Sequence, residues 1–169
     1  MPDFYSFARG LAIGFNALGF GHILFTHGFA CLPTSGISMM PTMDPTGTWV
    51  LISKHYRRGR DVKVGDVVDF LHPYVPNTGV VKRVVGMPGD FVLEGTPYKG
   101  DGTMVQVPEG HCWVAGDNQT WSRDSRVYGP IPLPLIKGKI IMTVWPRHKF
   151  GPMVNTLRPL DDDGLLDGP

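Results

Sequence analysis

The hydrophobic positions divide the chain into one long uncharged stretch followed by a series of short apolar runs. Residues 11–33 carry no formally charged side chain and are rich in Leu, Ile, Phe, Ala and Gly. A helix of about 20 apolar residues can cross a bilayer, so this stretch predicts a membrane anchor. A cleaved signal peptide and a buried or interfacial helix are the alternatives. Asn16 and His22 interrupt the stretch, and Arg9 alone makes a weak basic segment before it.

From Thr48 onward the pattern is that of strands and turns. Short apolar runs are separated by Gly and by polar clusters, and the run at 79–86 is rich in β-branched residues. At least six strands are predicted, from the runs at 49–52, 66–71, 79–86, 91–93, 104–107, 112–115 and 140–145. No long amphipathic helix is predicted in this part of the chain.

These patterns predict a mainly β domain with a single N-terminal membrane helix. The expected divisions are an anchor at 1–33, a β domain at 34–152 and a tail at 153–169. The end of that tail is acidic and rich in Gly, a composition that disfavours a packed core and predicts disorder.

Composition excludes several classes of function. The 169 residues have a net charge of +1, without the basic stripe typical of nucleic-acid binding. The six histidines are scattered, and Cys31 and Cys112 have neither zinc-site spacing nor a disulfide framework. We therefore expect no metal, no cofactor and no nucleic-acid partner, and two separate thiols in preference to a disulfide.

Ser38 is the candidate nucleophile, in the segment Gly36-Ile37-Ser38-Met39-Met40-Pro41-Thr42. A serine hydroxyl needs a base to become nucleophilic. Simple turn chemistry is the alternative role for this serine, and Ser35 is a competing nucleophile on the same reasoning.

Lys82 is the candidate base. On a strand it shares a face with Val80 and Val84, whereas Arg83 points the other way. An apolar face disfavours the charged amine and lowers its pKa, so the neutral amine can accept the serine proton in a Ser-Lys variant of the serine-protease triad. The alternative is a lysine whose amine reaches solvent.

A third polar cluster, at 116–126, follows a predicted strand. Its side chains suit either a polar surface loop or a scaffold of ion pairs. In the second case Asp124 pairs with Arg126, and Asp117 reaches Arg83. Asn118-Gln119-Thr120 matches a glycosylation pattern, which we interpret as incidental because a sugar there would block the site.

Taken together, four segments resemble the conserved boxes of the type I signal peptidases, in the order of that family. They are Ser-Gly-Ile-Ser-Met-Met-Pro-Thr (35–42), Gly-Asp-Val-Val (65–68), Lys-Arg-Val-Val-Gly-Met-Pro-Gly-Asp (82–90), and Gly-Asp-Asn with Ser-Arg-Asp-Ser-Arg (116–118 and 122–126). The resemblance covers roughly residues 30–150 and implies a signal-peptidase-like β-barrel catalytic domain. Within the family, the short chain and the segments at 57–60, 86–90, 107–114 and 135–140 most resemble the fungal mitochondrial inner-membrane peptidases, of the type of their first catalytic subunit.

The resemblance implies a role for each matching residue. Ser38 would be the nucleophile and Lys82 the general base, while Ser122 would orient the amine. Two ion pairs would brace the site, Asp117 with Arg83 and Asp124 with Arg126. Gly36 stands where some relatives have an oxyanion-donating serine, so the oxyanion would rest on backbone N–H groups, including that of Ser38.

The resemblance also implies partners and a location. Substrates would be the sorting sequences of preproteins delivered to the mitochondrial intermembrane space. The enzyme would sit in the inner membrane with its catalytic domain facing that space, beside a second related peptidase subunit and the lipid bilayer. The alternatives are a non-enzymatic partner subunit that binds presequences, and another Ser-Lys protease of the bacterial or self-cleaving repressor type.

Overall fold

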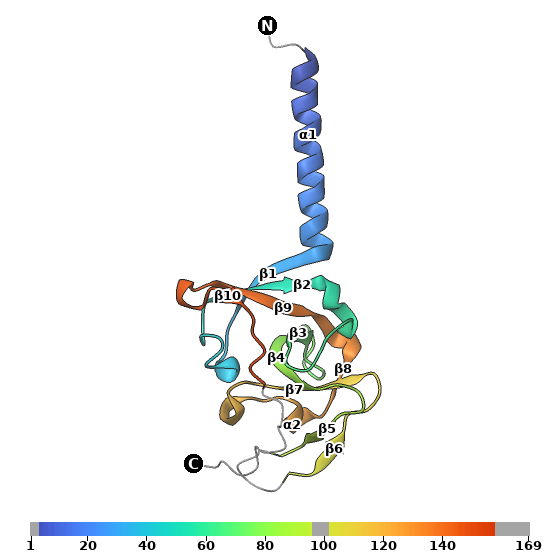
Figure 1. The fold of residues 1–169 in the computed structure, drawn as a ribbon, viewed down its shortest axis with the longest axis vertical. Helices are drawn as coiled ribbons and strands as arrows, with labels where there is room; N and C mark the ends of the chain where they lie inside the picture. Colours follow the sequence, from blue (N-terminus) through green and yellow to red (C-terminus); the bar gives the residue numbers. More distant parts are fainter. Residues whose placement is uncertain (1–3, 96–101, 158–169) are drawn as a thin grey trace.

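One long helix stands on a β-rich domain in the computed structural model, which describes residues 4–95 and 102–157 (Figure 1). Helix α1 (Phe4–Ile23) continues into one π-helical turn, η1 (Leu24–Gly28). Among the residues described, no helix combines the length and the apolar character that crossing a membrane requires.

The uncharged stretch at 11–33 is divided between this helix and the first strand. Strand β1 (Phe29–Thr34) pairs antiparallel with β2 (Thr48–Ser53), with Cys31 opposite Leu51. The expected boundary between residues 33 and 34 therefore falls inside a strand, and the sheet begins at Phe29. Hydropathy alone missed this because an apolar edge strand and an apolar helix look alike over a few residues.

Most strands of the domain belong to one sheet, in the order β1-β2-β9-β3-β4-β7-β8, with β10 also paired to β9. Strands β5 and β6 form a separate two-stranded sheet. Beyond β1 and β2, the strands are β3 (Val67–Leu71), β4 (Gly79–Gly86), β5 (Phe91–Leu93), β6 (Met104–Gln106), β7 (His111–Ala115), β8 (Ile131–Pro132), β9 (Ile136–Trp145) and β10 (Gly151–Pro152). The other short helices are η2 (Ile37–Met39), η3 (Lys54–Gly59), η5 (Gln119–Trp121), α2 (Ser125–Tyr128), η6 (Leu133–Leu135) and η7 (Arg147–Lys149).

The prediction of a mainly β domain is confirmed, in the form of a curled sheet that runs as an open path from β1 to β8. Each predicted run lies in or overlaps a strand, and the run at 79–86 has the same bounds as β4. Strands β8 and β10 were not predicted, because two residues are too few to show an alternating pattern.

Three apolar clusters fill the described part of the domain. The first gathers side chains of β3, β4, β7 and β9 around Phe70, and the second gathers β2 and the segment after η2 around Val50 and Met43. The third, smaller cluster contains Val92, Val107 and Trp113. Because apolar side chains cover both of its faces, β4 lies in the interior. The functional residues on it are held by packing on each side.

The segment after β10 makes hydrogen bonds with the domain. Arg83 donates a hydrogen bond to the carbonyl of Val154, at 3.1 Å, and the Asn155 amide donates to the carbonyl of Val64, at 3.4 Å. These contacts lie at the start of the tail at 153–169, whose disorder stays a prediction. The remainder of that tail, 158–169, lies outside the described residues.

Candidate active site

Ser38 lies in the turn η2, between the edge strand β1 and the interior of the domain. Gly36 precedes the turn with a φ of 120°, a conformation that side-chain-bearing residues rarely adopt. Met39 and Met43 are buried behind the turn, at 3% and 2% exposure. The turn is therefore fixed by apolar anchors while Ser38 remains at the surface of a cleft.

Lys82 lies in the middle of β4 and is 4% exposed. Burial lowers the pKa of its amine, because the charged form loses hydration. The negative charges of Asp124 and Asp117 act in the opposite direction and raise it, but the net shift is downward. The environment therefore shifts the amine toward its neutral form.

The structure brings Ser38 and Lys82 together across 44 residues of sequence. Lys82 Nζ lies 2.5 Å from Ser38 Oγ. A neutral amine at this distance can accept the hydroxyl proton directly. Ser35, the competing nucleophile, lines the same cleft, but the contact of the amine is with Ser38.

The cleft in front of this pair has a volume of about 380 Å³. Apolar and polar side chains share its walls, and among them Asp69 on β3, 6% exposed, pairs with Lys137 at 3.2 Å. Burial raises the pKa of the Asp69 carboxyl. The cleft thus combines apolar side chains with charged groups beside Ser38 and Lys82.

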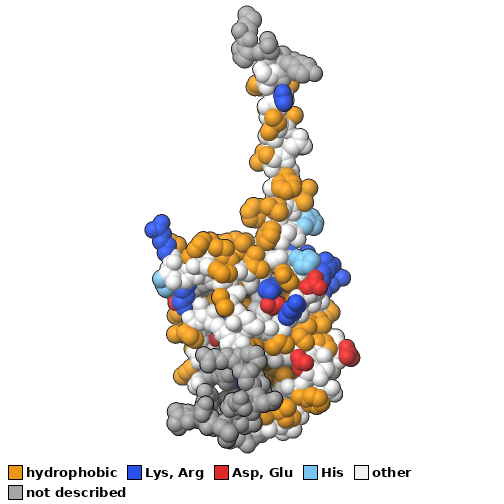
Figure 2. All heavy atoms as spheres, in the orientation of Figure 1, with side chains coloured by type: hydrophobic (Ala, Val, Ile, Leu, Met, Phe, Trp, Pro, Cys, Tyr) orange, Lys and Arg blue, Asp and Glu red, His pale blue; other side chains and the backbone are white. Residues whose placement is uncertain are grey.

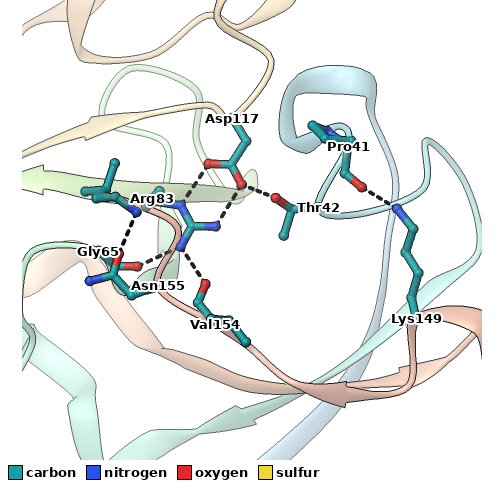
Figure 3. Close-up of polar contacts among 9 residues, drawn as sticks. Pro41, Thr42, Gly65, Arg83, Asp117, Lys149, Val154 and Asn155 are labelled. Atoms are coloured by element: carbon teal, nitrogen blue, oxygen red, sulfur yellow. Dashed lines mark hydrogen bonds and ion pairs between the residues drawn. The ribbon is translucent and has the colours of Figure 1, made fainter. Parts of the chain in front are cut away.

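Arg83, next to Lys82 on β4, is the centre of a buried brace (Figure 3). Its guanidinium makes two hydrogen bonds to the carboxylate of Asp117, each 2.8 Å, and donates to the carbonyl of Gly65 at 2.7 Å. Asp117 in turn accepts from Thr42 Oγ1 in the segment that follows Ser38. The brace links the strand that carries Lys82 to the segment that carries Ser38.

A second ion pair lies beneath the loop at 116–126. Asp124 is fully buried and accepts two hydrogen bonds of 2.8 Å from the Arg126 guanidinium. Burial alone would raise the pKa of Asp124, but Arg126 and the Gly116 N–H lower it below its ordinary value. Both expected pairings, 83 with 117 and 124 with 126, are present.

Ser122 was expected to orient the Lys82 amine, and its observed surroundings differ from that prediction. Its hydroxyl oxygen is buried without a hydrogen bond of ordinary geometry in the part of the chain that is described, so none joins it to Lys82. It lies close enough to Asp124 to favour the ionised form of that carboxyl.

Asn118 is a site residue that the sequence reasoning missed. Its backbone N–H donates to the carbonyl of Ser38 at 2.9 Å, and its side-chain amide donates to the carbonyl of Ile37 at 3.1 Å. The residue matched a glycosylation pattern, but its amide faces the nucleophile turn. Only its place directly after Asp117 could have indicated this role.

Gly116 allows the loop to approach that turn. A Cβ at this position would lie 2.2 Å from Ser122 Oγ and 2.5 Å from the backbone oxygen of Ser38. We expect Gly116→Ala to displace the nucleophile turn and to lower kcat/KM about 100-fold, since small misplacements of reacting groups have effects of this size. Peptide cleavage, measured beside the unfolding midpoint, tests this.

The companion variant is Gly116→Ala with Ser122→Gly. It removes the clash with the Ser122 side chain but not the clash with the Ser38 backbone. We therefore expect kcat/KM to recover only in part. Full activity of Gly116→Ala alone would show that the close approach is unimportant.

A protein-family model described as "Signal peptidase, peptidase S26" matches residues 8–99 and 93–145 of this chain. The chain is 40% identical over 146 residues to mitochondrial inner membrane protease subunit 1 of Saccharomyces cerevisiae, covering 79% of this chain and 77% of the relative. It is 42% identical over 143 residues to the protein of the same name from Schizosaccharomyces pombe, covering 84% and 88%.

Among solved structures, the chain is similar to a signal peptidase I from Enterococcus faecalis. The sequence identity is 21% and the TM-score 0.41, with 48% of this chain and 97% of that chain covered.

Proposed function

Because the chain belongs to the signal peptidase, or peptidase S26, family, we propose that Ser38 and Lys82 form its catalytic dyad. The chain is a serine peptidase of the signal peptidase I type, of the mitochondrial inner membrane. The observation that carries the proposal is the 2.5 Å contact between Ser38 Oγ and Lys82 Nζ, made by an amine that is buried.

In the proposed reaction, Lys82 Nζ accepts the proton of Ser38 as Oγ adds to the scissile carbonyl carbon. The same nitrogen then gives this proton to the leaving amine while the C–N bond breaks, which leaves an ester on Ser38. Lys82 next takes a proton from water as the water oxygen adds to the ester. It returns this proton to Ser38 Oγ as the acid product leaves.

The negative oxygen formed in each addition step needs hydrogen-bond donors. We assign these to backbone N–H groups at the nucleophile turn, including that of Ser38, because Gly36 carries no hydroxyl. A preorganised donor of this kind contributes about 3–4 kcal/mol to transition-state stabilisation. The contacts of Asn118 with residues 37 and 38 support a turn held in one conformation.

The substrates we propose are the sorting sequences of proteins delivered to the intermembrane space, with the catalytic domain on that side of the inner membrane. The yeast relatives are named as subunit 1 of a protease, which supports assembly with a second, related subunit. The open cleft beside Ser38 suits an extended peptide segment.

The pH dependence of cleavage tests the role of Lys82. Protonation of the amine removes the base, so kcat/KM should fall as the pH is lowered through the pKa of Lys82. Because burial lowers that pKa, the midpoint of this acidic limb should lie well below about 10.4, the value for free lysine. The measurement is cleavage of a presequence peptide over a series of pH values.

Lys82→Arg is the matched control, since a guanidinium keeps its proton throughout this range. We expect it to be inactive at every pH. An acidic limb at or above the pKa of free lysine would contradict the dyad.

A further inference from the structure

The turn at 54–63 concentrates positive charge at one place on the domain. It holds five basic side chains and one acidic side chain, a net charge of +4 in a chain whose total is +1. The rest of the chain therefore carries −3. Three arginines of this turn, Arg57, Arg58 and Arg60, are exposed, and we call them the arginine cluster.

The arginine cluster is free of carboxylate partners within residues 4–95 and 102–157, where none of the ion pairs involves it. The one acidic residue of the turn, Asp61, pairs with His55 at 2.9 Å. Arg58 has a φ of 60°, which is uncommon for a residue with a side chain. The guanidinium groups are therefore available to an outside anion.

The cluster has a fixed place beside the foot of the N-terminal helix. Lys54, at the start of η3, donates to the carbonyls of Phe25 and Thr26 in η1, at 2.8 and 2.9 Å. Figure 2 shows Lys and Arg side chains gathered where the apolar helix meets the domain. A helix that enters a bilayer from this side would bring the cluster to the level of the lipid headgroups.

We propose that the arginine cluster binds the phosphate groups of anionic phospholipids at the membrane surface. A planar guanidinium matches phosphate geometry with two parallel hydrogen bonds. Each basic residue next to an anionic membrane surface strengthens binding by roughly fivefold. The contact would hold the domain against the membrane with its helix foot facing the lipid, independently of the chemistry at Ser38.

The test uses the full chain with vesicles of phosphatidylcholine alone or mixed with phosphatidylglycerol. The measurements are partitioning at low and high salt, and trypsin cleavage at the cluster relative to cleavage at Arg123, an exposed arginine outside the turn. We expect anionic lipid to strengthen partitioning at least tenfold at low salt, and to protect the cluster from trypsin.

The triple variant Arg57→Gln, Arg58→Gln, Arg60→Gln should lose the preference for anionic lipid and keep its binding to neutral vesicles. Arg58→Gln should lose part of the preference for anionic lipid, while the matched control Arg123→Gln should keep all of that preference. Peptide cleavage in detergent should be unchanged in each variant, which separates this proposal from the dyad. Equal partitioning of wild type and triple variant onto anionic vesicles at low salt would overturn the proposal. So would trypsin cleavage of the wild-type cluster that is the same with neutral and with anionic vesicles.

Discussion

Lys82→Met should abolish peptide cleavage while leaving the fold intact. Without the amine, Ser38 Oγ loses the 2.5 Å contact through which its proton would leave. Loss of one member of such a catalytic unit lowers kcat by a factor on the order of 10⁴ to 10⁶. Methionine fills a similar volume in the same buried site, and single-turnover cleavage of a presequence peptide measures the loss.

Ser38→Ala should be as inactive as Lys82→Met, and the double variant should be no slower than either, since the two residues act on one proton. Ser35→Ala is the matched control and should keep most of the activity. Substantial cleavage by Ser38→Ala would exclude the mechanism. An inactive wild type would favour a presequence-binding subunit or a missing partner.

Lys82→Met should also stabilise the folded protein near neutral pH. Because the pKa of Lys82 is lower in the folded state than in the unfolded state, the unfolded state binds more protons. Stability of the wild type then rises with pH through the window between the two pKa values. The stability gained by Lys82→Met should therefore be present below about 10.4, the pKa of lysine in the unfolded state, and disappear above it.

Arg83→Met should have the largest effect on stability, about 3–5 kcal/mol, the usual result of removing one partner of a buried ion pair. Arg83 is 1% exposed and makes four hydrogen bonds, two to Asp117 and one each to the carbonyls of Gly65 and Val154. Its loss leaves the Asp117 carboxylate with Thr42 as its remaining side-chain donor in the described structure. Urea unfolding measures the change.

Adding Asp117→Leu to Arg83→Met should recover part of the stability, because no unpaired charge remains in the interior. Arg58→Gln, which alters an exposed arginine without an ion pair in the described structure, should change stability by less than about 0.5 kcal/mol. If Arg83→Met unfolds at the wild-type urea concentration, the brace does not stabilise the fold.

The sequence predicted the site better than it predicted the edges of the fold. Strand β4 was expected with its observed bounds, because β-branched residues fill it between Gly79 and Gly86. The pairings of Asp117 with Arg83 and of Asp124 with Arg126 were also expected, and both are present. By contrast, the start of the sheet at Phe29 was hidden within a continuous apolar stretch.

The missed contacts connect segments far apart in the chain. Asn118 reaches Ile37 across 81 residues, Thr42 reaches Asp117 across 75, and Arg83 reaches Val154 across 71. A local pattern states which residue types are present but not which distant backbone oxygen each will face. The contacts of residues 154 and 155 were missed for the same reason, because they lie on residues 83 and 64.

By itself the sequence determined the chemical groups available, a serine in a tight turn, a lysine on an apolar strand and two acid–base pairs, because residue type and spacing are local properties. Only the tertiary structure decided that Ser38 and Lys82 meet, that Gly116 must lack a side chain, and that the arginine cluster lies at the helix foot. Those outcomes depend on which strands pair and which side chains exclude water, and both are settled by packing of the whole domain.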